Sequence, residues 1–170
     1  MIRLATLALV FALPLAACGS GKDGTSIAFN ANGSGGNVLG GVDAKSGEMS
    51  INAPGFSGKI NLPKIRLDAD NVDLNGVHLY PGSKVAAMKI DAHDDGKLGK
   101  DDGGTVKISF ESPAGPDTVR AWFENKLSHA GFTVHDDGTG LSGTTDEHKP
   151  FTLDLSPDGA DHAKGTMTIG

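Results

Sequence analysis

Short runs of alternating apolar and polar residues in the middle of the chain constrain its fold most strongly. Alternation with a period of two is typical of a β-strand, because successive side chains point to opposite faces of a sheet. The pattern apolar-x-apolar-x-x-apolar-x-apolar occurs three times at offsets of eleven and twelve residues, and each copy predicts two short strands joined at a break. Its members are Met49, Ile51, Pro54 and Phe56, then Ile60, Leu62, Ile65 and Leu67, and finally Val72, Leu74, Val77 and Leu79.

Two arrangements of these strands are open. No copy can bury its own apolar face, so stacked copies predict a β-solenoid with a continuous core. The same spacing fits a plain antiparallel meander. The Gly- and Asn-rich stretch followed by repeated strands loosely resembles the β-solenoid of bacterial adhesin heads over residues 25–85. The resemblance is one of fold, and it implies an adhesin-like surface component as one class of function.

Composition limits the size of the core and the kind of partner. Glycine supplies 25 of the 170 residues, whereas aromatic residues are scarce, with seven Phe, one Trp and one Tyr. The formal net charge is −6, which argues against a nucleic-acid partner, since phosphate neutralisation needs an excess of Lys and Arg. A single Cys rules out a disulfide scaffold.

The N-terminus has the organisation of a secretory signal peptide. One charge at Arg3 precedes an uncharged, mostly apolar run from Leu4 to Ala17. This run is shorter than the roughly 20 residues that span a bilayer. A basic start, a short apolar stretch and small residues at its end predict cleavage and export.

The end of that run resembles the lipobox of bacterial lipoproteins. It reads Leu15-Ala16-Ala17-Cys18, and Cys18 is the only cysteine. The resemblance implies cleavage after Ala17 and attachment of acyl chains, palmitate among them, to Cys18. In that family an Asp after the cysteine retains the protein at the inner membrane, so Gly19 at this position favours the outer membrane. An ordinary signal peptide that happens to end near a cysteine is the alternative.

The composition of the chain predicts five segments and a mainly β fold with an α+β C-terminal part. The stretch from Gly19 to Gly41 has eight Gly and is expected to be largely flexible, with at most a short strand at 27–29. Residues 91–104 have the sequence DAHDDGKLGKDDGG, and we expect them to form a solvated linker. The segments are a signal peptide (1–17), a lipidated Cys with its tether (18–41), a strand-rich module (42–90), an acidic Gly-rich linker (91–104) and an α+β module (105–170).

The last segment is predicted as β-α-β-β-β, with one helix on a small antiparallel sheet. Its helix begins near Pro116, which suits a first helical position, and ends at Gly131, a left-handed cap. The apolar face of the helix and the inward positions of the strands form the expected core. Helix positions are Val119, Trp122, Phe123, Leu127 and Ala130, and strands are expected at 105–111, 132–135, 150–155 and 165–169, with a further short one at Leu141.

A calcium loop is the sharpest candidate for chemistry, and the sequence argues against it. Calcium loops require hard oxygen ligands and a bidentate Glu at position 12, but here position 3 is His93 and position 12 is Asp102. We therefore interpret the segment as a charged linker. The residues at the other loop positions 1, 5, 6 and 8 are Asp91, Asp95, Gly96 and Leu98.

No metal, cofactor or catalytic residue is predicted. The histidines are dispersed, without the i, i+4 pair that places two imidazoles on one metal, so solvated side chains are expected. Gly140–Thr144 differs from a nucleophile elbow by one position. The six histidines are His78, His93, His129, His135, His148 and His162.

These observations predict a non-catalytic binding or structural lipoprotein of the bacterial cell envelope. Its partners are expected to be the membrane, through the lipid on Cys18, and an envelope protein or polymer. The expected location is the outer membrane, facing the periplasm. An adhesin-like surface component is the first alternative, and a metal-handling protein or hydrolase is the second.

Overall fold

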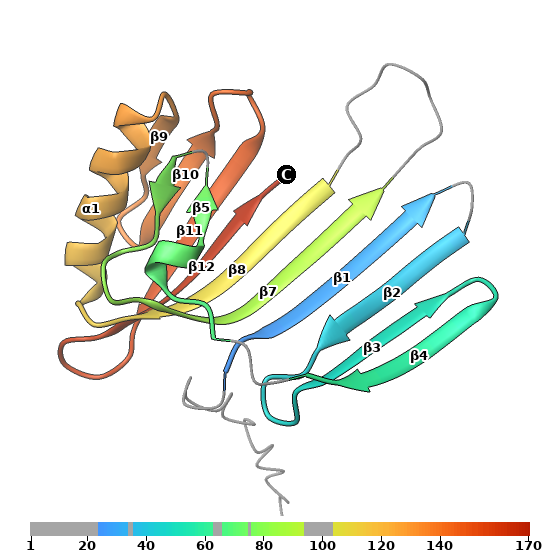
Figure 1. The fold of residues 1–170 in the computed structure, drawn as a ribbon. Coiled ribbons are helices and arrows are strands. Elements are labelled where there is room, and N and C mark those ends of the chain that lie inside the picture. Colours follow the sequence, from blue (N-terminus) through green and yellow to red (C-terminus); the bar gives the residue numbers. More distant parts are fainter. Residues whose placement is uncertain (1–23, 34–35, 63–65, 75, 94–103) are drawn as a thin grey trace, which may run out of the picture.

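The fold is described from a computed structural model, which covers residues 24–33, 36–62, 66–74, 76–93 and 104–170. Ten strands of these residues form one large mixed sheet in the order β4-β3-β2-β1-β7-β8-β12-β11-β10-β9, and β5 and β6 form a separate pair. The mainly β fold with a helix late in the chain is confirmed (Figure 1). The strands are β1 (Ser26–Gly33), β2 (Gly36–Val42), β3 (Glu48–Ala53), β4 (Phe56–Asn61), β5 (Asp73–Leu74), β6 (Val77–His78), β7 (Lys84–His93), β8 (Gly104–Ser112), β9 (Thr133–Asp136), β10 (Gly140–Thr144), β11 (Pro150–Pro157) and β12 (Ala163–Ile169), and the helices are the 3-10 helix η1 (Ala69–Asn71) and α1 (Pro116–His129).

The first four strands form an antiparallel meander, which we call the wing. Each pairs with the next along the chain, from β1–β2 through β3–β4. Gly40 lies opposite Phe29 in this register, and the Phe29 ring lies over it. An aromatic ring on a cross-strand glycine shields backbone that glycine leaves bare, and this explains how a Gly-rich sequence forms regular strands.

A parallel contact joins the wing to the rest of the sheet. β1 pairs with β7 over residues Ser26–Asn32 and Ala87–His93. Two parallel strands need a long crossover connection, and here that crossover contains the rest of the wing and residues 66–83. Part of this segment continues the pairing of β7, because Val85 N–H donates to the Leu67 carbonyl at 2.9 Å.

The C-terminal strands are all antiparallel, in the order β8-β12-β11-β10-β9. The element order from β8 is β-α-β-β-β-β, so the strand expected near Leu141 is present as β10 and adds one to the predicted set. The helix starts at Pro116 as predicted. It ends before Gly131, whose φ is 87°, and Phe132 N–H donates to the Leu127 carbonyl across this cap.

The core lies under the helix, and its residues fall between Leu67 and Ile169. Phe123 and Leu127 on α1 are fully buried, and the Phe123 ring lies 5.8 Å from that of Phe110 on β8. The 66–83 segment packs beside the helix, because the Tyr80 ring meets that of Trp122 edge-on at 5.8 Å.

The segment expected to be a flexible tether differs in the structure. Within 18–41, residues 26–33 form β1 and residues 36–41 belong to β2, so the strand expected at 27–29 is present and is longer. Glycine carries little alternation signal of its own, and the apolar cover comes from the neighbouring strand.

The expected linker at 91–104 also differs where the structure describes it. Its first three residues complete β7 and its last begins β8, and these two strands pair along their length. The core also contains residues from both sides of the expected linker, since Leu79 and Val85 pack with residues of 105–170. Residues 94–103 lie outside the described residues.

Of the two arrangements left open for the repeated pattern, the structure has an antiparallel meander at the first copy, and residues 63–65 of the second copy lie outside the described residues. The first copy forms the β3–β4 hairpin, with Pro54 in its turn, whereas the third copy forms the small β5–β6 pair in the core. Equal spacing therefore does not produce equal structure, and the solenoid expectation is wrong for this region.

Candidate interaction surface

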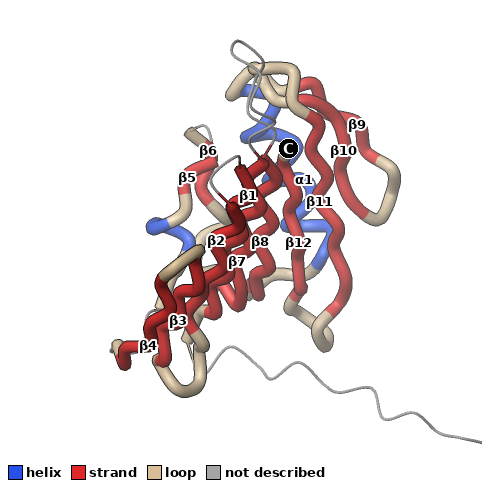
Figure 2. The backbone as a smooth tube through the Cα atoms, turned by 90° about the vertical axis from the view of Figure 1, so that its right-hand side faces the viewer, coloured by secondary structure: helices blue, strands red, loops and turns tan. Residues whose placement is uncertain are grey.

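The sheet has one apolar and one polar face. The helix α1 covers only the part of the apolar face that the C-terminal strands form. On β8, Ile108 and Phe110 point to the helix while Lys107 and Ser109 point away. The register carries this division through β7 and β1 into the wing. In Figures 1 and 2, α1 lies near β9–β12, and β4 lies at the opposite edge of the sheet.

The wing continues the apolar face. Three alternate residues of each wing strand point to this face, and none of them has a polar side chain. Phe56 and Ile60 on β4 are 61% and 56% exposed, and Ile90 on the adjoining β7 is 36% exposed. We call this surface the apolar wing face. Its residues are Ile27, Phe29 and Ala31, then Val38, Gly40 and Val42, then Met49, Ile51 and Ala53, and finally Phe56, Gly58 and Ile60.

Two aromatic rings fill the gaps that glycines would leave in the apolar wing face. The Phe29 ring lies over Gly40, and a Cβ added at Gly58 would lie 3.1 Å from the Phe56 ring. The rings therefore occupy the space above the two glycines of the face. The result is a sheet surface suited to another flat layer, because sheets pack face to face about 10 Å apart.

The opposite face of the wing is polar and contains a shallow depression of about 570 Å³. Ser50, Asn52 and Ser57 line it together with Leu39, which is 46% exposed. Lys59 closes one side and forms an ion pair with Glu48 at 2.8 Å. The hydrogen bond that Lys59 donates to Glu48 in this pair raises the pKa of Lys59 above its usual value.

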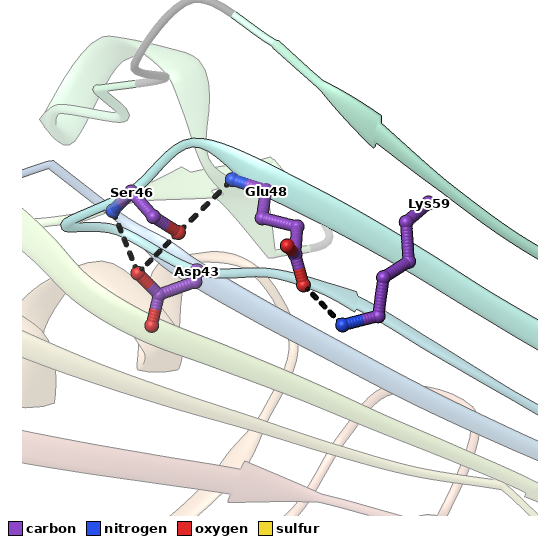
Figure 3. Close-up of polar contacts among 4 residues, drawn as sticks. All are labelled: Asp43, Ser46, Glu48 and Lys59. Atoms are coloured by element: carbon purple, nitrogen blue, oxygen red, sulfur yellow. Dashed lines mark hydrogen bonds and ion pairs between the residues drawn. The ribbon is translucent and has the colours of Figure 1, made fainter.

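A hydrogen-bonded turn fixes the β2–β3 connection (Figure 3). Asp43 Oδ1 accepts hydrogen bonds from Ser46 N–H at 2.7 Å and Ser46 Oγ at 2.9 Å. It also accepts one from Lys45 N–H at 3.0 Å. Ser46 Oγ also accepts one from Glu48 N–H. The hydrogen bonds from Ser46 are the main reason that the pKa of Asp43 is lowered.

A buried hydroxyl joins the base of the wing to the core. Thr25 is 1% exposed, and its Oγ1 accepts a hydrogen bond from Leu67 N–H at 3.0 Å and donates one to the Val85 carbonyl at 2.6 Å. A hollow of about 380 Å³ lies beside it, with charged groups at Arg66, Asp68 and Lys84. The Thr25 side chain thus satisfies two backbone groups at a junction in the sheet. On one side of this junction β7 pairs with β1, and on the other side it bonds to Leu67.

The residues that carry the predicted lipid anchor, Ala17 and Cys18, lie outside the described residues. So do Asp95, Gly96, Leu98 and Asp102 of the loop tested for calcium. Asp91 and His93 belong to β7, where Asp91 forms an ion pair with Lys89 at 2.8 Å.

The histidines are dispersed over the fold. The ring Nδ1 atoms of His78 and His129 lie 3.2 and 2.7 Å from the carbonyls of Val72 and Asn125. In the part of the chain that the structure describes, no group of three metal-ligating side chains gathers.

Comparison of the chain with family models, curated proteins and solved structures finds no match. Within the ranges described here, no helix combines the length and the apolar character needed to cross a membrane.

Sequence reasoning missed the apolar wing face as a surface, although it identified several of its residues. The alternation at Met49, Ile51 and Phe56 was visible, and so was that at Ile27 and Phe29. What was missing is that these residues share one face, which requires the pairing of β1 with β2 and of β2 with β3.

Proposed function

We propose that the protein is a non-catalytic binding or structural lipoprotein of the bacterial cell envelope, anchored through Cys18 and facing the periplasm from the outer membrane. The anchor rests on the lipobox-like residues Leu15–Cys18. Two or more acyl chains hold a protein stably at a membrane.

The position of the first strand is compatible with such an anchor. Cys18 precedes Gly24, the first described residue, by six positions. An extended chain covers at most about 3.5 Å per residue, so the lipid would lie within about 21 Å of the base of the wing. The folded part would therefore sit close to the membrane that holds it.

The observation that carries the binding function is the apolar wing face. Phe56 and Ile60 are more than half exposed and belong to one continuous surface without a polar side chain. Contiguous apolar surface of this kind marks sites where a protein meets another molecule. Such a surface stabilises a complex when its apolar side chains are buried against another molecule, which suits a structural or binding role.

The anchor is tested by metabolic labelling with palmitate in a bacterial host that processes lipoproteins. Cys18→Ser should lose the label and leave the membrane fraction, whereas the neighbouring change Ser20→Ala should keep both properties. Equal labelling of the wild type and Cys18→Ser would contradict the proposal. Protease treatment of intact cells separates the two locations, because a periplasmic module is spared and an adhesin-like surface component is removed.

A further inference from the structure

We propose that the apolar wing face binds a second copy of this chain, so that two wings stack face to face as a β-sandwich. This inference rests on the proposed function in one respect, that the apolar wing face is a binding surface. It does not depend on lipid attachment at Cys18.

The flat relief of the face favours another sheet over a small molecule. Small-molecule sites are concave and combine apolar walls with a few placed polar groups. The inward positions of the wing carry apolar side chains or Gly, and the Phe29 ring fills the space above Gly40. The two hollows described above lie at Thr25 and on the polar face.

The area of the face is also in the range of a specific contact. Strands about 4.8 Å apart with a rise of about 3.3 Å per residue give the wing and β7 together about 500 Å². Two copies would then bury about 1,000 Å², near the lower limit for specific interfaces. A reversible dimer of moderate affinity is therefore expected.

The charge of the chain favours a second copy over a membrane surface. Anionic lipid headgroups attract basic segments, and this chain has 15 Lys and Arg against 21 Asp and Glu. Amphipathic elements that lie in a membrane carry Lys and Arg on their polar side, whereas Lys59 on the polar face of the wing pairs with Glu48.

The charges of the wing are compatible with stacking. Glu48 and Lys59 point to the polar face, away from the proposed contact. Two-fold symmetry would place identical apolar surfaces against each other, so no uncompensated charge would be buried.

Sedimentation equilibrium of residues 19–170, which retain every described element, tests the proposal. The decisive variant is Ile60→Lys, which places a charge on the apolar wing face at its β4 edge. Its matched control is Leu39→Lys, which changes a similarly exposed residue on the polar face of the same wing. Far-ultraviolet circular dichroism, to which the strands of the wing contribute along with those of the core, checks the folding of each variant.

We expect a concentration-dependent dimer for the wild type and for Leu39→Lys. Ile60→Lys should weaken association at least about tenfold, because a desolvated, unpaired charge is costly. A second variant, Ile51→Ser, keeps the experiment decisive if Ile60→Lys fails to fold, since it should weaken the dimer in the same direction.

Three results would overturn the inference. A wild type that stays monomeric at about 100 µM, or a dimer that survives both Ile60→Lys and Ile51→Ser, would exclude this interface. Flotation of monomers with phosphatidylethanolamine vesicles that is lost in Ile60→Lys would identify a membrane as the occupant. A wild type that takes up no palmitate would contradict the anchor alone, so the two proposals fail separately.

Discussion

Phe110 and Gly165 are cross-strand partners on β8 and β12, and the Phe110 ring lies directly over the glycine. A Cβ at residue 165 would collide with three atoms of that ring. The ring is fully buried and also packs against Phe123 on α1. The same relationship, between Phe29 and Gly40, recurs in the wing.

Gly165→Ala should therefore destabilise the protein by about 1–3 kcal/mol, because the Phe110 ring must move within a packed core. Gly104→Ala is the matched control, since the added methyl would make only ordinary contacts, the nearest at 3.4 Å. Urea unfolding followed by Trp122 fluorescence measures both. Equal midpoints for the two variants would contradict the packing account.

Thr25→Val should also destabilise the fold. The valine fills the same space but cannot bond to Leu67 N–H or to the Val85 carbonyl. Leaving buried backbone groups unsatisfied costs about 1–3 kcal/mol. Thr25→Ser keeps the hydroxyl and should retain most of the stability. A Val variant as stable as the Ser variant would show that the hydroxyl is dispensable.

The C-terminal part of the fold could be predicted from the sequence because its signals are local. Helical spacing of Val119, Phe123 and Leu127 and the cap at Gly131 define α1. The wing was harder to predict, because Gly40 and Gly58 interrupt its alternation and their cover comes from Phe29 and Phe56.

The continuity of the sheet and the candidate surface could not be predicted, since both depend on long-range pairing. Nothing local in the sequence indicates that β1 lies parallel to β7, some sixty residues later. The stretch after His93 is rich in Asp and Gly, so it resembled a boundary between domains, although β7 and β8 on either side of it pair.

The core therefore predicts different behaviour for two fragments. Residues 66–170 should unfold cooperatively, whereas residues 105–170 alone should not, because they lack Leu79, Val85 and the other core residues of 66–90. Urea titration with Trp122 fluorescence distinguishes them. A cooperative transition in 105–170 would show that the second module is independent.

Within the longer fragment, Phe123→Ala should cost about 3–5 kcal/mol, because the ring is fully buried at the centre of the core. The exposed neighbour Glu124 provides the control, since Glu124→Ala should change stability by less than about 0.5 kcal/mol. Similar losses in both variants would contradict the location of the core.

Acid should loosen the β2–β3 turn. The pKa of Asp43 is below its usual value of 3.8 in the folded protein. A lowered pKa stabilises the folded turn above the unfolded value, and that contribution is lost as the pH falls through the folded pKa. Hydrogen exchange at the Ser46 amide should therefore speed up, relative to the intrinsic rate, below about pH 4. Asp43→Asn should remove this pH dependence, and an unchanged profile in that variant would assign it to another group.

The most direct test of the account asks whether the apolar wing face is covered in the envelope. Ser50 and Ile51 are neighbours on β3, half-buried, and point to opposite faces. With Cys18 blocked by lipid, Ser50→Cys and Ile51→Cys each provide one free thiol for a hydrophilic maleimide in isolated envelopes. We expect Ser50→Cys to react readily and Ile51→Cys to be protected until the protein is extracted and diluted. Equal labelling of the two thiols in the envelope would contradict this expectation.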